Sequence, residues 1–178
     1  MQTFLEILKY TLPAIIVLIA TSIIVNRFLI TETRRKQLAI FQEGMQTTLR
    51  LRLQAYERLS VFLERIHPGQ VITRAYQSGM TVRDLQTAII TSIKLEFEHN
   101  LSQQIYVSTE VWKTVQSVKE QEMAMINQIA SGLNPDADAK ELHQRIIAFV
   151  KDSEDRLPVE IALGILNDEA KIVLSQQS

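Results

Sequence analysis

The fold is decided at the N-terminus by one uncharged stretch, Tyr10-Thr-Leu-Pro-Ala-Ile-Ile-Val-Leu-Ile-Ala-Thr-Ser-Ile-Ile-Val-Asn26. Arg27 follows, and then three more apolar residues that end at Ile30. A helix of about 20 apolar residues crosses the hydrocarbon core of a bilayer, and residues 10–30 number 21. Arg27 is compatible with such a span because its alkyl chain lets the guanidinium reach the headgroups. We therefore predict a transmembrane anchor over residues 1–31, with residues 10–30 in contact with the lipid bilayer.

Two other interpretations fit the apolar stretch less well. A cleaved signal peptide has a basic start, a short apolar core and a cleavage site of small residues. Ala20-Thr-Ser22 resembles such a site, but the apolar run continues past it, and the preceding segment contains Glu6 as well as Lys9. The second alternative is the buried core helix of a soluble protein.

The charges that flank the anchor predict its orientation. Four basic residues follow the apolar stretch: Arg27, Arg34, Arg35 and Lys36. Because Lys and Arg accumulate on the cytoplasmic side of membrane spans, we expect the protein in the inner (cytoplasmic) membrane with residues 32–178 in the cytoplasm. These basic residues are either a topology signal or a specific site for acidic lipid.

The chain after the anchor is rich in helix formers and has only 5 Gly and 4 Pro in total. Apolar residues recur there at steps of three and four, as one face of a helix requires. The stripe consists of Leu38, Phe41, Met45, Leu49, Leu53, Tyr56, Leu59, Leu63 and Ile66. No proline follows the anchor until Pro68. We therefore predict one helix from the anchor to about residue 66, whose part beyond the membrane forms a stalk.

Four to five shorter helices are predicted after the stalk. Their boundaries are indicated by proline at a first helical position, glycine at a C-terminal cap and hydroxyl side chains at N-caps. The residues concerned are Pro68, Gly79, Thr81, Ser108, Gly132 and Pro158. We expect a turn at residues 103–107 and a helix from Asp136 to Lys151. The last helix is expected to pack through a face that includes Ile161 and Ile165.

These elements predict an all-α fold. A single N-terminal transmembrane helix continues into the stalk helix and an antiparallel helical bundle, because long amphipathic helices with short connections pack in that way. The predicted domains are the anchor, residues 1–31, and a helical domain, residues 32–178.

Two Glu-x-x-His sequences raise the possibility of a metal site. They are Glu64-Arg-Ile-His67 and Glu96-Phe-Glu-His99, and di-iron helical bundles use pairs of this kind. Both pairs end their predicted helices, and antiparallel helices would hold them at opposite ends of the bundle. We therefore predict no bound metal and no cofactor.

A polar cluster and the only tryptophan are candidates for a partner-binding surface: Glu96, Glu98, His99, Asn100 and Trp112. The cluster is alternatively a solvated helix end or a buried network that fixes the bundle. Trp112 lies one residue off the apolar line of its helix, so it is either an interface anchor or part of the core.

Other chemistry finds no support in the sequence. There is no cysteine, and no phosphate-binding loop, dinucleotide fingerprint or nucleophile motif occurs. The net charge is −1 with 22% charged residues, and basic residues do not gather with aromatic ones, so nucleic acid is not an expected partner. We predict no catalytic residues and no enzyme activity.

Three segments carry a family resemblance: residues 51–66, beginning Leu51-Arg-Leu-Gln-Ala-Tyr56, residues 79–86, and residues 96–107. Over residues 10–130 the chain resembles a family of small, uncharacterised single-pass membrane proteins of Bacteroidetes. The resemblance implies the anchor and the helical body, and it implies no activity and no functional residues.

The function predicted from the sequence is that of a membrane-tethered cytoplasmic helical scaffold or accessory subunit. Such a protein would bind an unknown protein partner, or itself, through its helix faces. The alternative is a metal- or ligand-binding helical enzyme that uses Glu96 and His99. A third possibility is a subunit of a larger integral-membrane complex.

Overall fold

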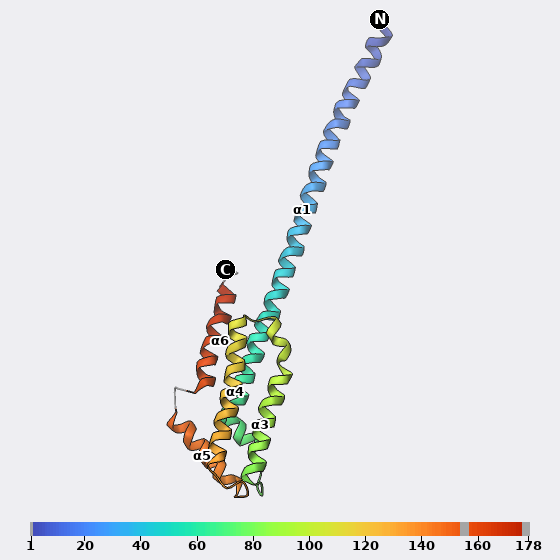
Figure 1. Cartoon of the computed structure of the whole chain (residues 1–178). Helices are drawn as coiled ribbons and strands as arrows, with labels where there is room; N and C mark the ends of the chain where they lie inside the picture. The colour runs from blue at the N-terminus through green and yellow to red at the C-terminus, as the bar shows by residue number, and fades with distance from the viewer. Residues whose placement is uncertain (1, 154–156, 176–178) are drawn as a thin grey trace. The chain divides into compact units, whose positions relative to one another are not determined.

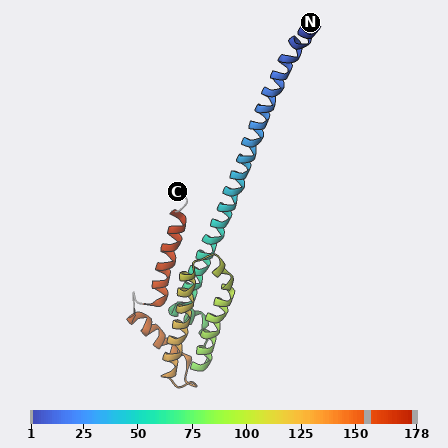
Figure 2. The ribbon, with the colours of Figure 1, turned by 45° about the horizontal axis from the view of Figure 1, so that its top comes forward.

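The computed structural model describes residues 2–153 and 157–175, with the backbone alone for residues 2–14. The regular structure of these residues is helical, apart from an isolated bridge between Thr81 and Asp138. Figure 1 and Figure 2 show α1 (Gln2–Ile66), α2 (Pro68–Ala75), α3 (Val82–His99), the 3₁₀ helix η1 (Leu101–Ile105), α4 (Thr109–Ser131), α5 (Ala139–Asp152) and α6 (Pro158–Ser175). The predicted all-α class is confirmed.

The chain forms two compact units, Met1–Thr48 and Leu49–Ser178. The first unit consists of the N-terminal part of α1, and the second contains the rest of α1 together with α2 to α6. Residues 32–48, which were expected to belong to the helical domain, are therefore grouped with the apolar stretch.

α1 is the unbroken helix predicted from the apolar stripe, and it ends at Ile66 as expected. It ends there because a proline disfavours helical backbone in the residue before it, and His67 takes φ −50° and ψ 131°. The His67 ring then caps α2, since its Nδ1 accepts a hydrogen bond of 3.2 Å from the Gly69 amide. Pro68 occupies the start of α2, where its missing amide hydrogen is not needed.

The second unit is an antiparallel bundle. Residues 49–66 of α1 and the helix α4 run in one direction, and α3 and α6 run in the other (Figures 1 and 2). α2 and α5 pack at the end of the bundle where α3 begins. The predicted antiparallel arrangement is confirmed.

The core of this unit has an aromatic centre. The Phe97 ring lies 5.9 Å from the Phe62 ring and is stacked on Trp112 with 5.4 Å between centroids. Fully buried aliphatic side chains complete the core, and they come from all six α-helices: Leu59, Leu63, Ile66, Ile72, Leu85, Ile89, Ile93, Ile126, Leu142, Ile146 and Leu166. Aromatic and branched side chains of this size supply most of the free energy that burial contributes to folding.

Local capping explains where α3 and α4 begin. Thr81 Oγ1 accepts a hydrogen bond of 3.2 Å from the Asp84 amide, and Asp84 Oδ2 accepts one of 3.0 Å from the Thr81 amide. This is a capping box with Asp in place of the usual Glu or Gln. Ser108 Oγ likewise accepts a hydrogen bond from the Val111 amide at 3.1 Å. Gly79 adopts φ +89°, a conformation that favours glycine, in the turn before Thr81.

The expected start of the fifth helix at Asp136 is wrong by three residues. α5 begins at Ala139, with Asp138 as its N-cap. The preceding residues are instead paired with the start of α3, where the Val82 amide donates to Ala137 O at 2.9 Å and the Ala139 amide donates to Met80 O at 3.0 Å. These long-range hydrogen bonds replace the hydrogen bonds that residues 136–138 would make within a longer α5.

The expected packing face of α6 is also partly wrong. Ile161 and Ile165 are exposed, whereas Val159, Ala162, Leu166 and Val173 are buried. α6 packs mainly on α4. A helix with one main neighbour buries only a narrow stripe, so two of its isoleucines remain on the outer side.

Candidate functional site

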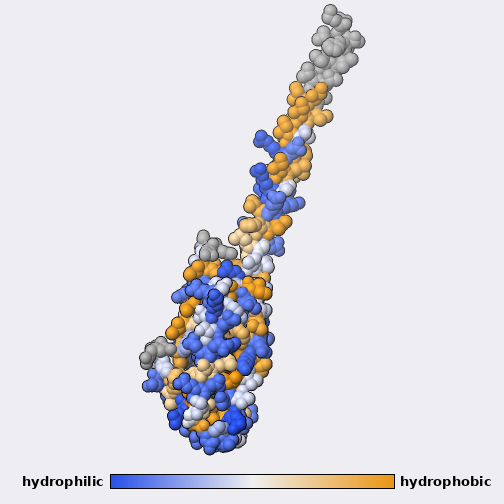
Figure 3. Space-filling model, viewed as in Figure 1, coloured by the Kyte–Doolittle hydropathy of each residue, from blue (hydrophilic) through white to orange (hydrophobic). Residues whose placement is uncertain are grey.

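The apolar stretch of the first unit is exposed from Ile15 onward. Every residue from Ile15 to Ile30 is exposed, and Figure 3 shows mainly hydrophobic surface on the visible face of this part of α1. Among the residues that the structure describes, α1 is the one helix long and apolar enough to cross a membrane, by length and composition. Exposed apolar surface of this extent is uncommon on soluble monomers and indicates contact with lipid or protein.

The four predicted basic residues lie on this helix, and all of them are exposed. Lys36 Nζ lies 3.9 Å from Glu32 Oε1, one turn away along the helix. A solvated pair of this kind contributes little to stability. The side chains of Arg27, Arg34 and Arg35 are exposed to solvent on α1.

An apolar stripe continues beyond the basic residues. Leu38, Phe41 and Met45 are exposed, and Phe41 leaves 65% of its surface accessible. Their steps of three and four residues place them on one face of α1. Glu43 lies on the opposite face, because successive residues of an α-helix are about 100° apart. The predicted apolar stripe thus has no partner in the first unit, whereas Tyr56, Leu59, Leu63 and Ile66 are buried in the bundle.

The polar cluster at the end of α3 is divided by the structure. Glu96 Oε1 lies 2.6 Å from Arg65 Nη2, and Asn100, only 5% exposed, donates from Nδ2 to Glu96 O at 2.8 Å. Of the alternatives left open for this cluster, Asn100 fits the buried one, because its side chain closes the end of its own helix. Glu98 and His99 are exposed and remain predicted contact residues.

Trp112 is part of the core and not a surface anchor. It is 8% exposed and is stacked on Phe97, with the rings inclined by 25°. Of the two alternatives for Trp112, an interface anchor or part of the core, the structure shows the core, because the first turn of α4 packs this side chain between the helices of the bundle.

The two Glu-x-x-His pairs are not held at opposite ends of the bundle. α2 extends the chain beyond the end of α1, and α3 begins only after it. When α3 returns along α1, its last turn therefore lies beside the last turns of α1. The ion pair between Arg65 and Glu96 shows this proximity. Even so, within residues 2–153 and 157–175 no group of three or more His, Cys, Asp or Glu side chains could hold a metal ion. The alternative of a metal enzyme based on Glu96 and His99 gains no support from this arrangement.

Glu122 is a buried acidic residue that the sequence analysis missed. It is 1% exposed, and its Oε2 has no hydrogen-bond partner among the described residues. Burial raises the pKa of this carboxyl from 4.5 to about 7, because a charged carboxylate loses its hydration inside the protein. The apolar line of α4 contained a signal, since Glu122 falls four residues after Val118 and four before Ile126.

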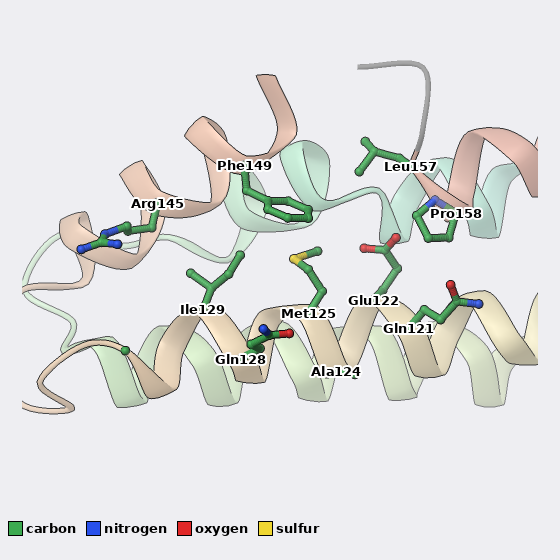
Figure 4. A pocket seen from close by; sticks show the side chains of 11 residues that line it. Gln121, Glu122, Ala124, Met125, Gln128, Ile129, Arg145, Phe149, Leu157 and Pro158 are labelled. Atoms are coloured by element: carbon green, nitrogen blue, oxygen red, sulfur yellow. The ribbon is translucent and has the colours of Figure 1, made fainter. Parts of the chain in front are cut away.

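Glu122 lines a pocket of about 670 Å³ between α4, α5 and the start of α6. Figure 4 shows the Glu122 carboxyl pointing across this pocket toward Leu157 and Pro158. Met125 and Ile129 continue the wall along α4, and Phe149 projects into it from α5. Arg145 lies at the far end from Glu122 (Figure 4). The pocket is thus mainly apolar with an acid near one end and a base at the other.

Comparison with known proteins assigns the chain to a family. The sequence pattern of DUF7935, a family of unknown function, matches residues 2–173. The chain belongs to family DUF7935. No curated protein and no solved structure matches it.

The DUF7935 match includes the apolar stretch, the stalk and the whole bundle, and so it extends beyond residues 10–130. It confirms the expected resemblance to an uncharacterised family, and it names no activity. The single-pass topology and the origin in Bacteroidetes, which the resemblance implied, remain predictions.

Proposed function

We propose that this chain is a membrane-tethered helical scaffold or accessory subunit that acts by binding another protein, without catalysis of its own. The observation that carries the proposal is the exposed apolar surface of α1, formed by the apolar side chains of residues 15–30 and, beyond the basic residues, by Leu38, Phe41 and Met45. Side chains of this kind are stabilised when lipid or protein covers them.

The anchor and its orientation form the first part of the proposal. Residues 10–30 span the inner (cytoplasmic) membrane, and the second unit lies in the cytoplasm. The apolar composition of α1 supports the span, and the exposed basic side chains that follow it support the orientation.

The stripe after the anchor forms the second part. Arg34 precedes Leu38 by four residues and Arg27 precedes Arg34 by seven, so both guanidinium groups share the face of the stripe. The two acidic residues in this part of the helix, Glu32 and Glu43, lie away from that face. The face is therefore apolar with a basic end next to the membrane.

This charge pattern favours a partner helix from a different protein. In a parallel pair of identical helices, Arg34 of each copy would face Arg34 of the other, and like charges repel. A helix with apolar residues and an acidic end near the membrane would complement the stripe in both charge and polarity. We propose such a helix, from a second membrane protein, as the occupant.

Photo-crosslinking of the full-length chain in its own membranes tests the partner surface. A photoreactive benzoylphenylalanine replaces Phe41, and a matched control replaces Glu43 on the opposite face. We expect position 41 to give a protein adduct of defined mass that position 43 does not give. Mass spectrometry of the adduct should identify a helical segment with acidic residues. Adducts with lipid alone, with a second copy of the chain, or equal adducts from both positions would contradict the proposal.

The orientation is tested with a single cysteine, because the chain has none of its own. Gln144→Cys introduces a thiol on the exposed side of α5. A maleimide that cannot cross membranes should label it only after the cells are permeabilised. Equal labelling of intact cells would place the bundle outside and refute the orientation.

A further inference from the structure

The pocket beside Glu122 has the features of a ligand site rather than of a packing defect. Its volume of about 670 Å³ falls within the range of about 300–1,000 Å³ of small-molecule sites, which are mostly apolar with a few polar groups that fix orientation. The pocket also contains the Glu122 carboxyl, which the fold buries and whose Oε2 has no hydrogen-bond partner among the described residues.

The unsatisfied oxygen of Glu122 indicates which chemical group a ligand of this pocket would supply. A buried polar atom without a partner costs about 1–3 kcal/mol, and Glu122 Oε2 is in that state among the described residues. An ionised carboxylate only accepts hydrogen bonds, so the missing group is a donor. A cationic donor fits best, because a charge-assisted bond is stronger than a neutral one and offsets the desolvation of the carboxylate.

The remaining walls define the rest of the ligand. Between Glu122 and Arg145 the apolar part of the wall is formed by Met125, Ile129 and Phe149, which can contact a hydrocarbon stem. The neutral amides of Gln121 and Gln128 also line the pocket. Arg145 at the far end (Figure 4) disfavours a second positive charge there. A ligand would therefore place a single cationic group at Glu122 and its apolar part along α4.

We propose that this pocket binds a primary ammonium group on an apolar stem, with the nitrogen at the Glu122 carboxylate and the stem against Met125, Ile129 and Phe149. The source is either a free amine or the lysine side chain of another protein. This proposal is independent of the membrane anchor and of the partner surface on α1.

The test uses three probes of the same shape and different charge: cyclohexylamine, cyclohexanol and cyclohexanecarboxylate. The full-length chain is held in nanodiscs of zwitterionic lipid at pH 8, with its methionine methyl groups labelled for NMR. Met125 lines the pocket and reports binding, whereas Met80 lies outside it and serves as an internal reference. We expect cyclohexylamine to shift the Met125 signal saturably and to bind at least about tenfold more tightly than either other probe.

Two variants locate the ammonium group. Glu122→Gln keeps the shape of the side chain and removes its charge, and it should weaken cyclohexylamine about tenfold or more while leaving cyclohexanol unchanged. Glu110→Gln removes an exposed carboxylate from the first turn of the same helix and should change the affinity of neither cyclohexylamine nor cyclohexanol. Equal binding of amine and alcohol by the unmodified chain, or the same amine affinity in Glu122→Gln, would overturn the proposal. The first of these comparisons needs no variant, so it holds even if a substitution impairs folding.

A second ligand pair distinguishes the two sources. Nα-acetyl-lysine methylamide carries the ammonium group on the lysine stem together with its backbone. If it shifts Met125 with an affinity near that of cyclohexylamine, the pocket admits a lysine of a partner protein. If only cyclohexylamine binds, the ligand is a free amine. Binding of neither probe would refute the site.

Discussion

Glu122 interrupts the apolar stripe of α4 and is buried there, and its Oε2 has no hydrogen-bond partner in the described part of the chain. Its folded-state pKa of about 7 lies above the ordinary 4.5, so between these values the folded chain retains a proton that the unfolded chain has released. This difference in proton binding favours the folded state most below about pH 4.5. The free energy of unfolding that it contributes is lost as the pH rises through 7. A difference of 2.5 pKa units corresponds to about 3 kcal/mol.

The first prediction follows from this titration. The free energy of unfolding of the unmodified chain, relative to that of Glu122→Gln, should fall by about 3 kcal/mol between pH 4.5 and pH 8. Chemical denaturation at a series of pH values, followed by the fluorescence of Trp112, measures both proteins. A difference that does not vary with pH would show that Glu122 is ionised or hydrated in the folded state.

Tyr56 and Glu169 form a part-buried polar contact between α1 and α6. Tyr56 Oη donates to Glu169 Oε1 at 2.6 Å, and Ser108 Oγ donates to Glu169 Oε2 at 2.7 Å. One carboxylate on α6 therefore joins α1 and the start of α4. Burial, together with the hydrogen bond to Glu169, raises the pKa of Tyr56 above its ordinary value.

A second prediction concerns this contact. Tyr56→Phe should destabilise the bundle by about 1–3 kcal/mol, because it removes a hydrogen bond to a charged acceptor. Tyr106→Phe, at a half-buried tyrosine of the turn after η1, should change stability by much less. A double-mutant cycle with Glu169→Gln should give a coupling energy of the same order. Additive effects of the two substitutions would contradict the contact.

At the scale of single residues, the sequence shows which side chains have distinctive chemistry, but it does not show whether each of them is buried or exposed. The sequence left Trp112 and Asn100 open between a surface contact and a buried position, and both are buried. Their burial depends on α1 and α3, which pack against them from other parts of the chain, and no local pattern reports that. Glu122 was missed for the same reason, although its place in an apolar line was visible.

At the scale of elements, the turn between α2 and α3 offers a direct test. Gly79 has φ +89° and lies in open space, so a side chain there meets no clash but must adopt an unfavourable backbone conformation. Gly164, within α6, also has no atom close enough to contact an added Cβ, and its backbone is helical.

The third prediction is that the same substitution has opposite effects at these two glycines. Gly79→Ala should destabilise the bundle by about 1–2 kcal/mol, and Gly164→Ala should stabilise it by up to about 1 kcal/mol because alanine favours helix. Thermal unfolding followed by circular dichroism measures both. A stabilising effect of Gly79→Ala would contradict the left-handed conformation of the turn.

Element boundaries were predictable where a local cap sets them. Thr81, Ser108, Gly132 and Pro158 begin or end helices as expected, because capping depends on atoms within a few residues. The start of α5 was not predictable in this way, since hydrogen bonds to Met80 and Val82, more than fifty residues earlier, hold the chain before Ala139. The exposed isoleucines of α6 could not be predicted for a similar reason. The periodicity of a sequence identifies the apolar residues of a helix, but not how many other helices pack against it.

At the scale of the whole molecule, the division between Thr48 and Leu49 predicts an independent bundle. The fragment 49–178 retains the core residues from Tyr56 to Val173 and omits the apolar stretch. We expect it to be soluble and helical, with cooperative unfolding and blue-shifted fluorescence of Trp112. A fragment that binds hydrophobic dyes and unfolds without cooperativity would show that the bundle requires the first unit.

The anchor is tested most directly by fractionating cells that produce the full-length chain. Membranes are washed with alkaline carbonate, which releases peripheral proteins, and mass spectrometry verifies that the first thirty residues are intact. We expect the full-length chain in the washed membrane pellet, because the exposed stretch Ile15–Ile30 is more stable in lipid than in water. Recovery of the intact chain in the aqueous supernatant would contradict the membrane anchor.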